Sequence, residues 1–264
     1  MTSILTNRSR QRVGLRAVMY REFHLLTRNR TNLLLSLLPT AIYILLFSTS
    51  LTRLVGNVRY DGVVVSYPQF TVPAIMLSSM LAASATTGTS LFQEELGGMA
   101  IELWSYPLSR GAYVTGKILA TTTLVMFQSL AALALGAVLF DLSWPASHWA
   151  ALIVGTLASS LAFNGIFLLL AAHVHDFQRF MVLVNTLGPL LLFSSPSFYP
   201  VDQMPTALRI ASMVNPVAYG VTCLRNAALF GPGAMWTYAV GLFAGAIILF
   251  AVIATVLTRR AADL

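Results

Sequence analysis

Six long apolar stretches dominate this chain, and none of them contains Asp, Glu, Lys, Arg or His. A helix needs about 20 apolar residues to cross the hydrocarbon core of a bilayer, and only the fifth stretch is clearly shorter than that. A soluble fold could not bury this much apolar surface, because 57% of the 264 residues are hydrophobic and only 9% are charged. The stretches are Leu33–Leu51, Phe70–Phe92, Ile118–Leu139, Trp149–Ala172, Phe180–Phe193 and Trp236–Leu257.

These stretches predict an all-α integral membrane protein with six transmembrane helices. We expect a single membrane domain over residues 1–264, because no stretch is left over for a folded soluble domain. The chain therefore has no room for a nucleotide-hydrolysing module of its own. Charges at membrane depth usually mark proton relays or ion pathways, and their absence from the six stretches indicates a transport body that draws its energy from elsewhere.

The basic residues indicate which end of each helix faces the cytoplasm. Seven arginines precede the first apolar stretch, where only Glu22 opposes them, and Arg259 and Arg260 follow the last one. An excess of Lys and Arg marks cytoplasmic segments, so we expect both termini inside. The formal charge of +7 does not predict nucleic acid as a partner, because no aromatic stacking pattern accompanies the basic residues.

Residues 11–30 mix apolar and basic side chains before the first crossing. Val13, Leu15 and Phe23 alternate with Arg12 and Arg16 in a moderately amphipathic pattern. Such a pattern favours an interfacial helix on the cytoplasmic leaflet. A plain basic flank is the alternative.

Two further segments do not fit a simple helical bundle. Residues 93–117 are cytoplasmic by the expected topology, and Pro107 before Ser109 predicts a turn followed by a short helix across the cytoplasmic face. Residues 194–230 are external and rich in proline, and they predict two short helices, Ala207–Val214 and Val217–Leu229, that enter the outer leaflet without crossing it. Upstream, an alternating segment from Val63 predicts a short strand or an extended loop.

Two motifs that suggest chemistry are better explained without it. Gly111–Lys117 fits the phosphate-cradling G-x-x-x-x-G-K pattern, but Ile118 stands where Ser or Thr should ligate magnesium. His173 and His175 lie two residues apart, so on a helix they point to different faces, and no third ligand cluster is evident. A membrane-embedded enzyme would need paired carboxylates, a zinc motif or a nucleophile with its base, and the apolar stretches contain none. We expect no enzymatic activity from this chain alone.

Four patches resemble the membrane subunits of type-2 ABC exporters (ABC-2 permeases), and those of daunorubicin-type drug exporters in particular. They are the basic run leading into the first crossing (Arg21–Phe47), the segment EELGGMAIELWSYPLSRGAYVTGK (residues 94–117), the external segment Phe198–Gly231, and the last crossing with its terminal arginines. The resemblance implies a bacterial cytoplasmic membrane protein that pairs with a second permease subunit, as a homodimer or a heterodimer. It also implies two copies of a separate ABC ATPase subunit, which bind ATP and Mg, so no cofactor is expected on this chain.

By the same resemblance, residues are assigned to ATPase coupling and to an external gate. One departure from the family pattern is that no basic residue stands beside Glu94 and Glu95. The coupling residues are Glu94, Glu95, Glu102, Leu103, Pro107, Ser109 and Arg110, and the gate residues are Tyr199, Pro200, Pro205, Asn215, Pro216, Tyr219 and Arg225.

Gln128, Asn164 and Asn185 are the polar residues expected at membrane depth. They either make interhelical hydrogen bonds or line a substrate pathway. A largely apolar pathway would suit hydrophobic or amphipathic drug- or lipid-like cargo, and membrane lipids would surround it. A permease for a lipid-linked glycan is the alternative, and an ion-coupled secondary transporter using hydroxyl and carbonyl oxygens stays open.

Overall fold

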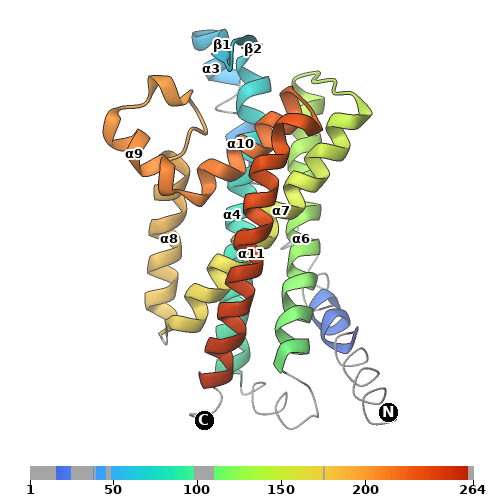
Figure 1. The fold of residues 1–264 in the computed structure, drawn as a ribbon, viewed down its shortest axis with the longest axis vertical. Helices are drawn as coiled ribbons and strands as arrows, with labels where there is room; N and C mark the ends of the chain where they lie inside the picture. The colour runs from blue at the N-terminus through green and yellow to red at the C-terminus, as the bar shows by residue number, and fades with distance from the viewer. Residues whose placement is uncertain are drawn as a thin grey trace.

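The computed structural model describes residues 16–24, 38, 40–45, 49–97, 110–174 and 176–260. Residues 16–24 and 40–45 are helical, and a series of long helices follows a small hairpin (Figure 1). The elements in chain order are α3 (Thr49–Val55), β1 (Asn57–Tyr60), β2 (Val63–Ser66), α4 (Tyr67–Leu96), α6 (Arg110–Leu139), α7 (Ala146–His173), α8 (Phe177–Phe193), η2 (Val201–Gln203), α9 (Thr206–Val214), α10 (Pro216–Leu229) and α11 (Pro232–Arg260).

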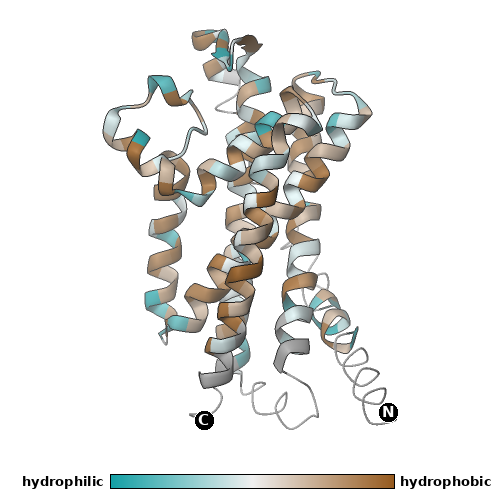
Figure 2. Ribbon diagram, in the orientation of Figure 1, coloured by the Kyte–Doolittle hydropathy of each residue, from teal (hydrophilic) through white to brown (hydrophobic). Residues whose placement is uncertain are grey.

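Four of the described helices, α4, α6, α7 and α11, are long and apolar enough to cross a membrane. A helix of 30 residues, the length of α4 and α6, spans about 45 Å, which exceeds the roughly 30 Å of a bilayer core. Apolar residues dominate the middle of these helices (Figure 2). The second, third, fourth and sixth predicted crossings are therefore confirmed as long apolar helices.

The other two predicted crossings are not established as spans. Residues 33–37, 39 and 46–48 of the first stretch lie outside the described residues, and α8 is an apolar helix of 17 residues. The bent pair formed by α9 and α10 would give a fifth span if it were counted as one. The described residues thus support four spans, or up to five if the bent pair is counted as one. The topology with six transmembrane helices stays a prediction.

An antiparallel hairpin adds β-structure to the predicted all-α fold. Asn57 pairs with Ser66 and Tyr60 with Val63, so only two residues join the strands. Both of them, Asp61 and Gly62, have positive φ, as a type I′ turn requires. The strand expected near Val63 is confirmed, and its partner β1 is an additional element.

The proline-rich segment forms the two predicted short helices, and their boundaries differ from the prediction by one residue each. Asn215 separates them, and its side-chain oxygen accepts a hydrogen bond from Val217 N at 2.9 Å. Asn is a preferred N-cap residue, and Pro216 then suits the first position of the helix. The chain bends by 86° at this point, so α10 runs back into the bundle.

The main hydrophobic core lies around α7, which packs against α4, α6, α10 and α11. Small residues permit this close packing. A Cβ added at Gly88 of α4 would lie 2.5 Å from the Phe180 ring and 2.9 Å from the Phe167 carbonyl oxygen, and one at Gly136 of α6 would lie 2.6 Å from Val72. These two glycines therefore permit close contact of their helices with neighbouring segments.

Candidate functional site

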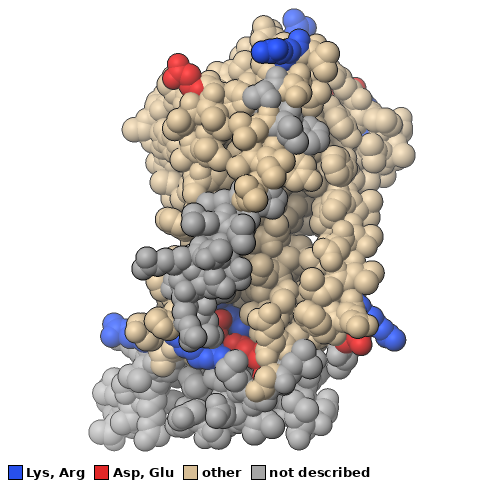
Figure 3. All heavy atoms as spheres, turned by 180° about the vertical axis from the view of Figure 1, so that it is seen from behind, with Lys and Arg blue, Asp and Glu red and all other residues tan. Residues whose placement is uncertain are grey.

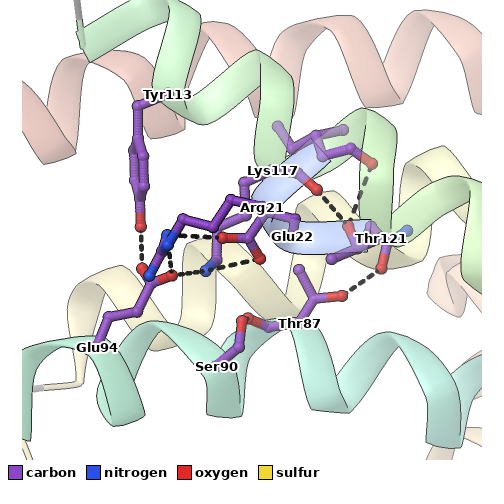
Figure 4. Close-up of polar contacts among 10 residues, drawn as sticks. Arg21, Glu22, Thr87, Ser90, Glu94, Tyr113, Lys117 and Thr121 are labelled. Atoms are coloured by element: carbon purple, nitrogen blue, oxygen red, sulfur yellow. Dashed lines mark hydrogen bonds and ion pairs between the residues drawn. The ribbon is translucent and has the colours of Figure 1, made fainter. Parts of the chain in front are cut away.

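Five side chains from three separate segments meet in a buried ionic cluster (Figure 4). Arg21 and Glu22 come from helix 16–24, Glu94 from the last turn of α4, and Tyr113 and Lys117 from the first turns of α6. Arg21 Nη1 lies 3.0 Å from both Glu22 Oε1 and Glu94 Oε1. Lys117 Nζ lies 3.1 Å from Glu94 Oε1 and 3.6 Å from Glu22 Oε2, and the Tyr113 hydroxyl donates to the Glu94 carboxylate. We call these five residues the ionic cluster.

The ionic cluster is buried and balanced in formal charge. The Lys117 side chain is 1% exposed, that of Glu22 2% and that of Glu94 6%. Taking charges out of water is costly, and mutual attraction offsets that cost only when geometry and hydrogen bonding are good. Burial raises the pKa of Glu22 above its ordinary value, although Lys117 opposes this shift. Burial and the Glu94 charge raise the pKa of Tyr113, so Tyr113 keeps its proton and acts as a donor.

The residues assigned to ATPase coupling fall partly outside the part of the chain that the structure describes. Glu94 lies in the ionic cluster, and its side chain is directed into the protein rather than toward solvent. Glu95 lies on α4 and Arg110 begins α6, but their side chains are not among those described. Glu102, Leu103, Pro107 and Ser109 lie outside the described residues.

At the opposite end of the molecule, Arg225 of α10 is completely buried. Its Nε donates to the Phe70 carbonyl oxygen at 3.0 Å, and Nη2 donates to the carbonyl oxygens of Pro196 and Ser197 at 2.9 and 3.1 Å. The guanidinium carbon lies 3.6 Å from the Phe70 ring centroid and 5.2 Å from that of Tyr60. Carbonyl dipoles and aromatic faces, rather than a carboxylate, thus surround this cation. Arg225 joins α10, the start of α4 and the 194–198 loop.

The remaining gate residues lie around the same turn. Asn215 Nδ2 donates to the Leu191 carbonyl oxygen at 2.6 Å and to Ser194 Oγ at 3.0 Å, so this residue also ties α10 to the end of α8. The Tyr219 hydroxyl donates to Met213 O at 2.6 Å and closes the corner between α9 and α10. Of the others, Tyr199 donates to Phe193 O, Pro200 precedes η2, Pro205 precedes α9, and Pro216 is the first residue of α10.

The three polar residues expected at membrane depth have different environments. Asn164 of α7 is fully buried, accepts from Thr87 at 2.8 Å and donates to Thr122 at 3.0 Å, so it joins α4, α6 and α7. Gln128 is buried on α6. Asn185 of α8 instead lines a cavity of about 400 Å³ between α4 and α8. Interhelical bonding therefore explains Asn164, and a place on a pathway fits Asn185.

Sequence reasoning missed most of the ionic cluster. By sequence alone, Arg21 is the start of the basic run that leads into the first crossing, Lys117 is the end of the 93–117 segment, and Glu22 is the acid that opposes the arginines. The signal that could have found the cluster is the place of these residues along the sequence. Glu94 lies near the end of one long helix and Lys117 lies near the start of the next, so antiparallel packing brings them to the same depth. Tyr113 carries no comparable signal in the sequence.

The described helices and the distribution of charge define a multi-pass helical membrane protein. Where Figure 3 shows described atoms, Lys, Arg, Asp and Glu lie toward the two ends, and the zone between them carries other residues. A bilayer imposes this arrangement, because charged groups avoid its hydrocarbon core.

Comparison with known proteins places the chain within this class. The model of the ABC-2 type transporter family matches residues 13–229, and the chain belongs to that family. Members are membrane subunits of transporters, are not themselves catalytic, and normally work with an ABC ATPase. The resemblance inferred from the four sequence patches is confirmed.

Two relatives carry the name Nodulation protein J. The protein of Rhizobium leguminosarum bv. viciae is 28% identical over 230 residues, which cover 85% of this chain and 85% of that protein. The protein of Rhizobium meliloti (strain 1021) is 26% identical over 230 residues, which cover 83% of this chain and 82% of that protein. Both alignments therefore extend over most of each chain.

Proposed function

We propose that this chain is the membrane-spanning subunit of an ATP-driven exporter, and that it moves amphipathic drug- or lipid-like molecules out of the cytoplasm or the inner leaflet. The chain lies in the bacterial cytoplasmic membrane with both termini inside. Leu33–Leu51 and α8 complete six crossings, and α9 and α10 form a re-entrant pair in the outer leaflet. Helix α8 spans about 26 Å, slightly less than the bilayer core.

In this proposal the motor is a separate chain. Two ABC ATPase subunits bind ATP and Mg, and they act on the coupling segment at residues 93–117. A second permease subunit, identical or different, completes the pathway. The external gate is built from α9, α10 and the loop that Arg225 and Asn215 hold.

The observation that carries this proposal is the amphipathic cavity between α4 and α8. Both walls combine polar and apolar side chains. The α4 wall presents Ser78, Ser79, Thr86 and Thr89 beside Leu81, Ala82 and Ala85, and the α8 wall presents Asn185 among apolar residues. A cavity of about 400 Å³ lies within the range of small-molecule sites. A molecule with an apolar body and a few hydrogen-bonding groups would match both walls.

A lipid-linked glycan is the second candidate cargo. The hydroxyl and amide groups on the cavity wall favour it, because they can pair with sugar hydroxyls as well as with the polar end of a drug. The two candidates differ in the size of the polar group that must pass the gate.

The test is reconstitution of the chain with the ABC ATPase encoded nearest to it. We expect ATP hydrolysis only from the complex, and ATP-dependent movement of a fluorescent amphipathic dye or phospholipid across proteoliposomes. Export of a lipid-linked oligosaccharide, but of neither dye nor phospholipid, would assign the glycan alternative. Hydrolysis by the isolated chain, or transport driven by an ion gradient without ATP, would overturn the proposal.

A further inference from the structure

The ionic cluster joins the two ends of the coupling segment to the N-terminal helix. Glu94 lies at the end of α4, where the chain leaves toward residues 98–109, and Lys117 lies two turns after the chain re-enters in α6. Arg21 contributes from a helix more than 70 residues earlier. Residues 98–109 connect α4 to α6 in the sequence. A force on this segment therefore acts on two helices whose adjoining ends are joined by the ionic cluster.

The cluster favours joint movement of its three segments. Glu94 has two cationic partners and a tyrosine donor, and Arg21 and Lys117 each face two carboxylates. Separating helix 16–24 would break the Arg21–Glu94 and Lys117–Glu22 pairs, and separating α4 from α6 would break the Lys117–Glu94 pair. In either case buried charges lose a partner, which is unfavourable. A buried polar network is costly when only some of its groups keep their partners, so the contacts of such a network tend to be retained together.

Helix 16–24 buries one apolar and one charged side chain and exposes aromatic ones. Its Val18 and Glu22 are 2% exposed, whereas Tyr20 is 74% and Phe23 49% exposed. Glu22 thus faces the protein and two aromatic rings face outward, where the headgroup region of a bilayer favours them. The helix can then stay at the membrane surface while the cluster ties it to α4 and α6.

We propose, on the basis of the ATP-driven function above, that Arg21, Glu94 and Lys117 are positioning residues for energy coupling. They hold helix 16–24, the end of α4 and the start of α6 as one body, so that force applied to the coupling segment moves all three together. Residues 16–24 thereby belong to the transmission element.

The first test compares Lys117→Met and Arg21→Met with Arg179→Met, which removes an exposed cation from the start of α8. Each variant is purified in complex with the ATPase and reconstituted into proteoliposomes, and substrate exported per ATP hydrolysed is measured. We expect the two cluster variants to assemble and hydrolyse ATP but to export about tenfold less substrate per ATP, and Arg179→Met to match the wild type. Unchanged export per ATP in both cluster variants would overturn the inference.

The second test replaces the ionic contact with a crosslink. It distinguishes a loss of positioning from a loss of folding. Cys223 is buried, so Cys223→Ser provides a background for the pair Arg21→Cys and Glu94→Cys, which a short bis-maleimide can join. We expect the uncrosslinked pair to be uncoupled, and crosslinking to restore export per ATP, because the segments then move together again. If the crosslinked protein stays uncoupled or loses ATPase activity, the inference about the ionic cluster is contradicted but the proposed function is not. A wild-type complex that neither hydrolyses ATP nor exports substrate would contradict the proposed function.

Discussion

At the scale of residues, two buried cations are stabilised in different ways. Lys117 lies between two carboxylates, so its charge is balanced by opposite charge. Arg225 has backbone carbonyl oxygens and two ring faces around it instead. The planar guanidinium suits this second environment, because it donates in several directions and stacks on rings.

Glu94 should matter more for stability than Glu22. Glu94 lies 3.0 Å from Arg21 and 3.1 Å from Lys117 and also accepts from Tyr113, whereas Glu22 lies 3.0 Å from its chain neighbour Arg21 and 3.6 Å from Lys117. We expect Glu94→Gln to lower the free energy of unfolding by about 3 kcal/mol and Glu22→Gln by about 1 kcal/mol. Thermal unfolding of the purified protein in detergent measures both, and equal losses would contradict this ranking.

The dependence of stability on pH gives a second comparison between the wild type and Glu22→Gln. Because burial raises the pKa of Glu22 above its ordinary 4.5, the folded state binds this proton more tightly than the unfolded state. The stability from this group is complete below the unfolded pKa and is lost as pH rises through the folded pKa. Glutamine has no such proton, so the stability advantage of wild type over Glu22→Gln should shrink as the pH rises above 4.5. An advantage that grows with pH would show that ion pairing outweighs burial.

Arg225→Lys should destabilise the outer end although it keeps the charge. An ammonium group at the end of a flexible stem cannot satisfy the carbonyl oxygens of Phe70, Pro196 and Ser197 with the same geometry. We expect a loss of about 3 kcal/mol in the free energy of unfolding, measured as a lower midpoint in thermal unfolding. Arg209→Lys on α9, at a partly exposed site, is the control, and a similar loss there would remove the special role of Arg225.

The distribution of charge in the sequence does not predict which contacts the charged residues make. Counting Lys and Arg on each side of the membrane treats them as surface groups, whereas Lys117 and Arg225 are both fully buried. The carboxylate partners of Lys117, Glu94 and Glu22, lie 23 and 95 residues away in the sequence, and the partners of Arg225 lie 28 to 155 residues away. Hydropathy and local motifs contain no information on such distant contacts.

At the scale of elements, the corner between α9 and α10 shows how local sequence sets geometry. The Asn215-Pro216 pair caps α10 and bends the chain by 86°. Asn215 also reaches the end of α8 through Leu191 and Ser194. The proposed gate therefore depends on one residue for both its bend and its attachment.

Asn215→Leu and Pro216→Ala should impair export while leaving membrane insertion intact. Loss of the cap costs about 1 kcal/mol locally, and Asn215→Leu also removes the contacts to α8. We expect reduced export of the fluorescent cargo in proteoliposomes at unchanged amounts of membrane-inserted protein. Val214→Leu, at a neighbouring position that is 83% exposed, is the matched control. Normal export by both variants would remove these residues from the gate.

Elements were predictable where the signal is local. The two short helices and their break follow from prolines and an N-cap, and the four long helices follow from apolar length. Strand β1 was missed, although Asp61-Gly62 between two extended runs is a recognised hairpin signal. The first crossing and residues 98–109 remain predictions, since the first falls partly and the second wholly outside the described residues.

At the scale of the whole molecule, the helices leave one amphipathic cavity on the α4–α8 side, and the proposed pathway depends on it. Ala82 lines this cavity and is exposed within it. We expect Ala82→Phe to fill part of the space and reduce ATP-dependent export severalfold, with thermal stability little changed because Ala82 is exposed. Export assays in proteoliposomes measure the effect. Val138→Phe, at an 80% exposed site on α6, should export normally, and equal export by the two variants would place the pathway elsewhere.

The contacts of Arg225 have an evolutionary consequence. Its hydrogen-bond acceptors are main-chain oxygens of positions 70, 196 and 197, which every amino acid supplies. Mutational drift at those three positions can therefore proceed without loss of the acceptors, while position 225 itself has no substitute among the twenty side chains. Descendants of this chain should vary in the loop and retain arginine in the helix.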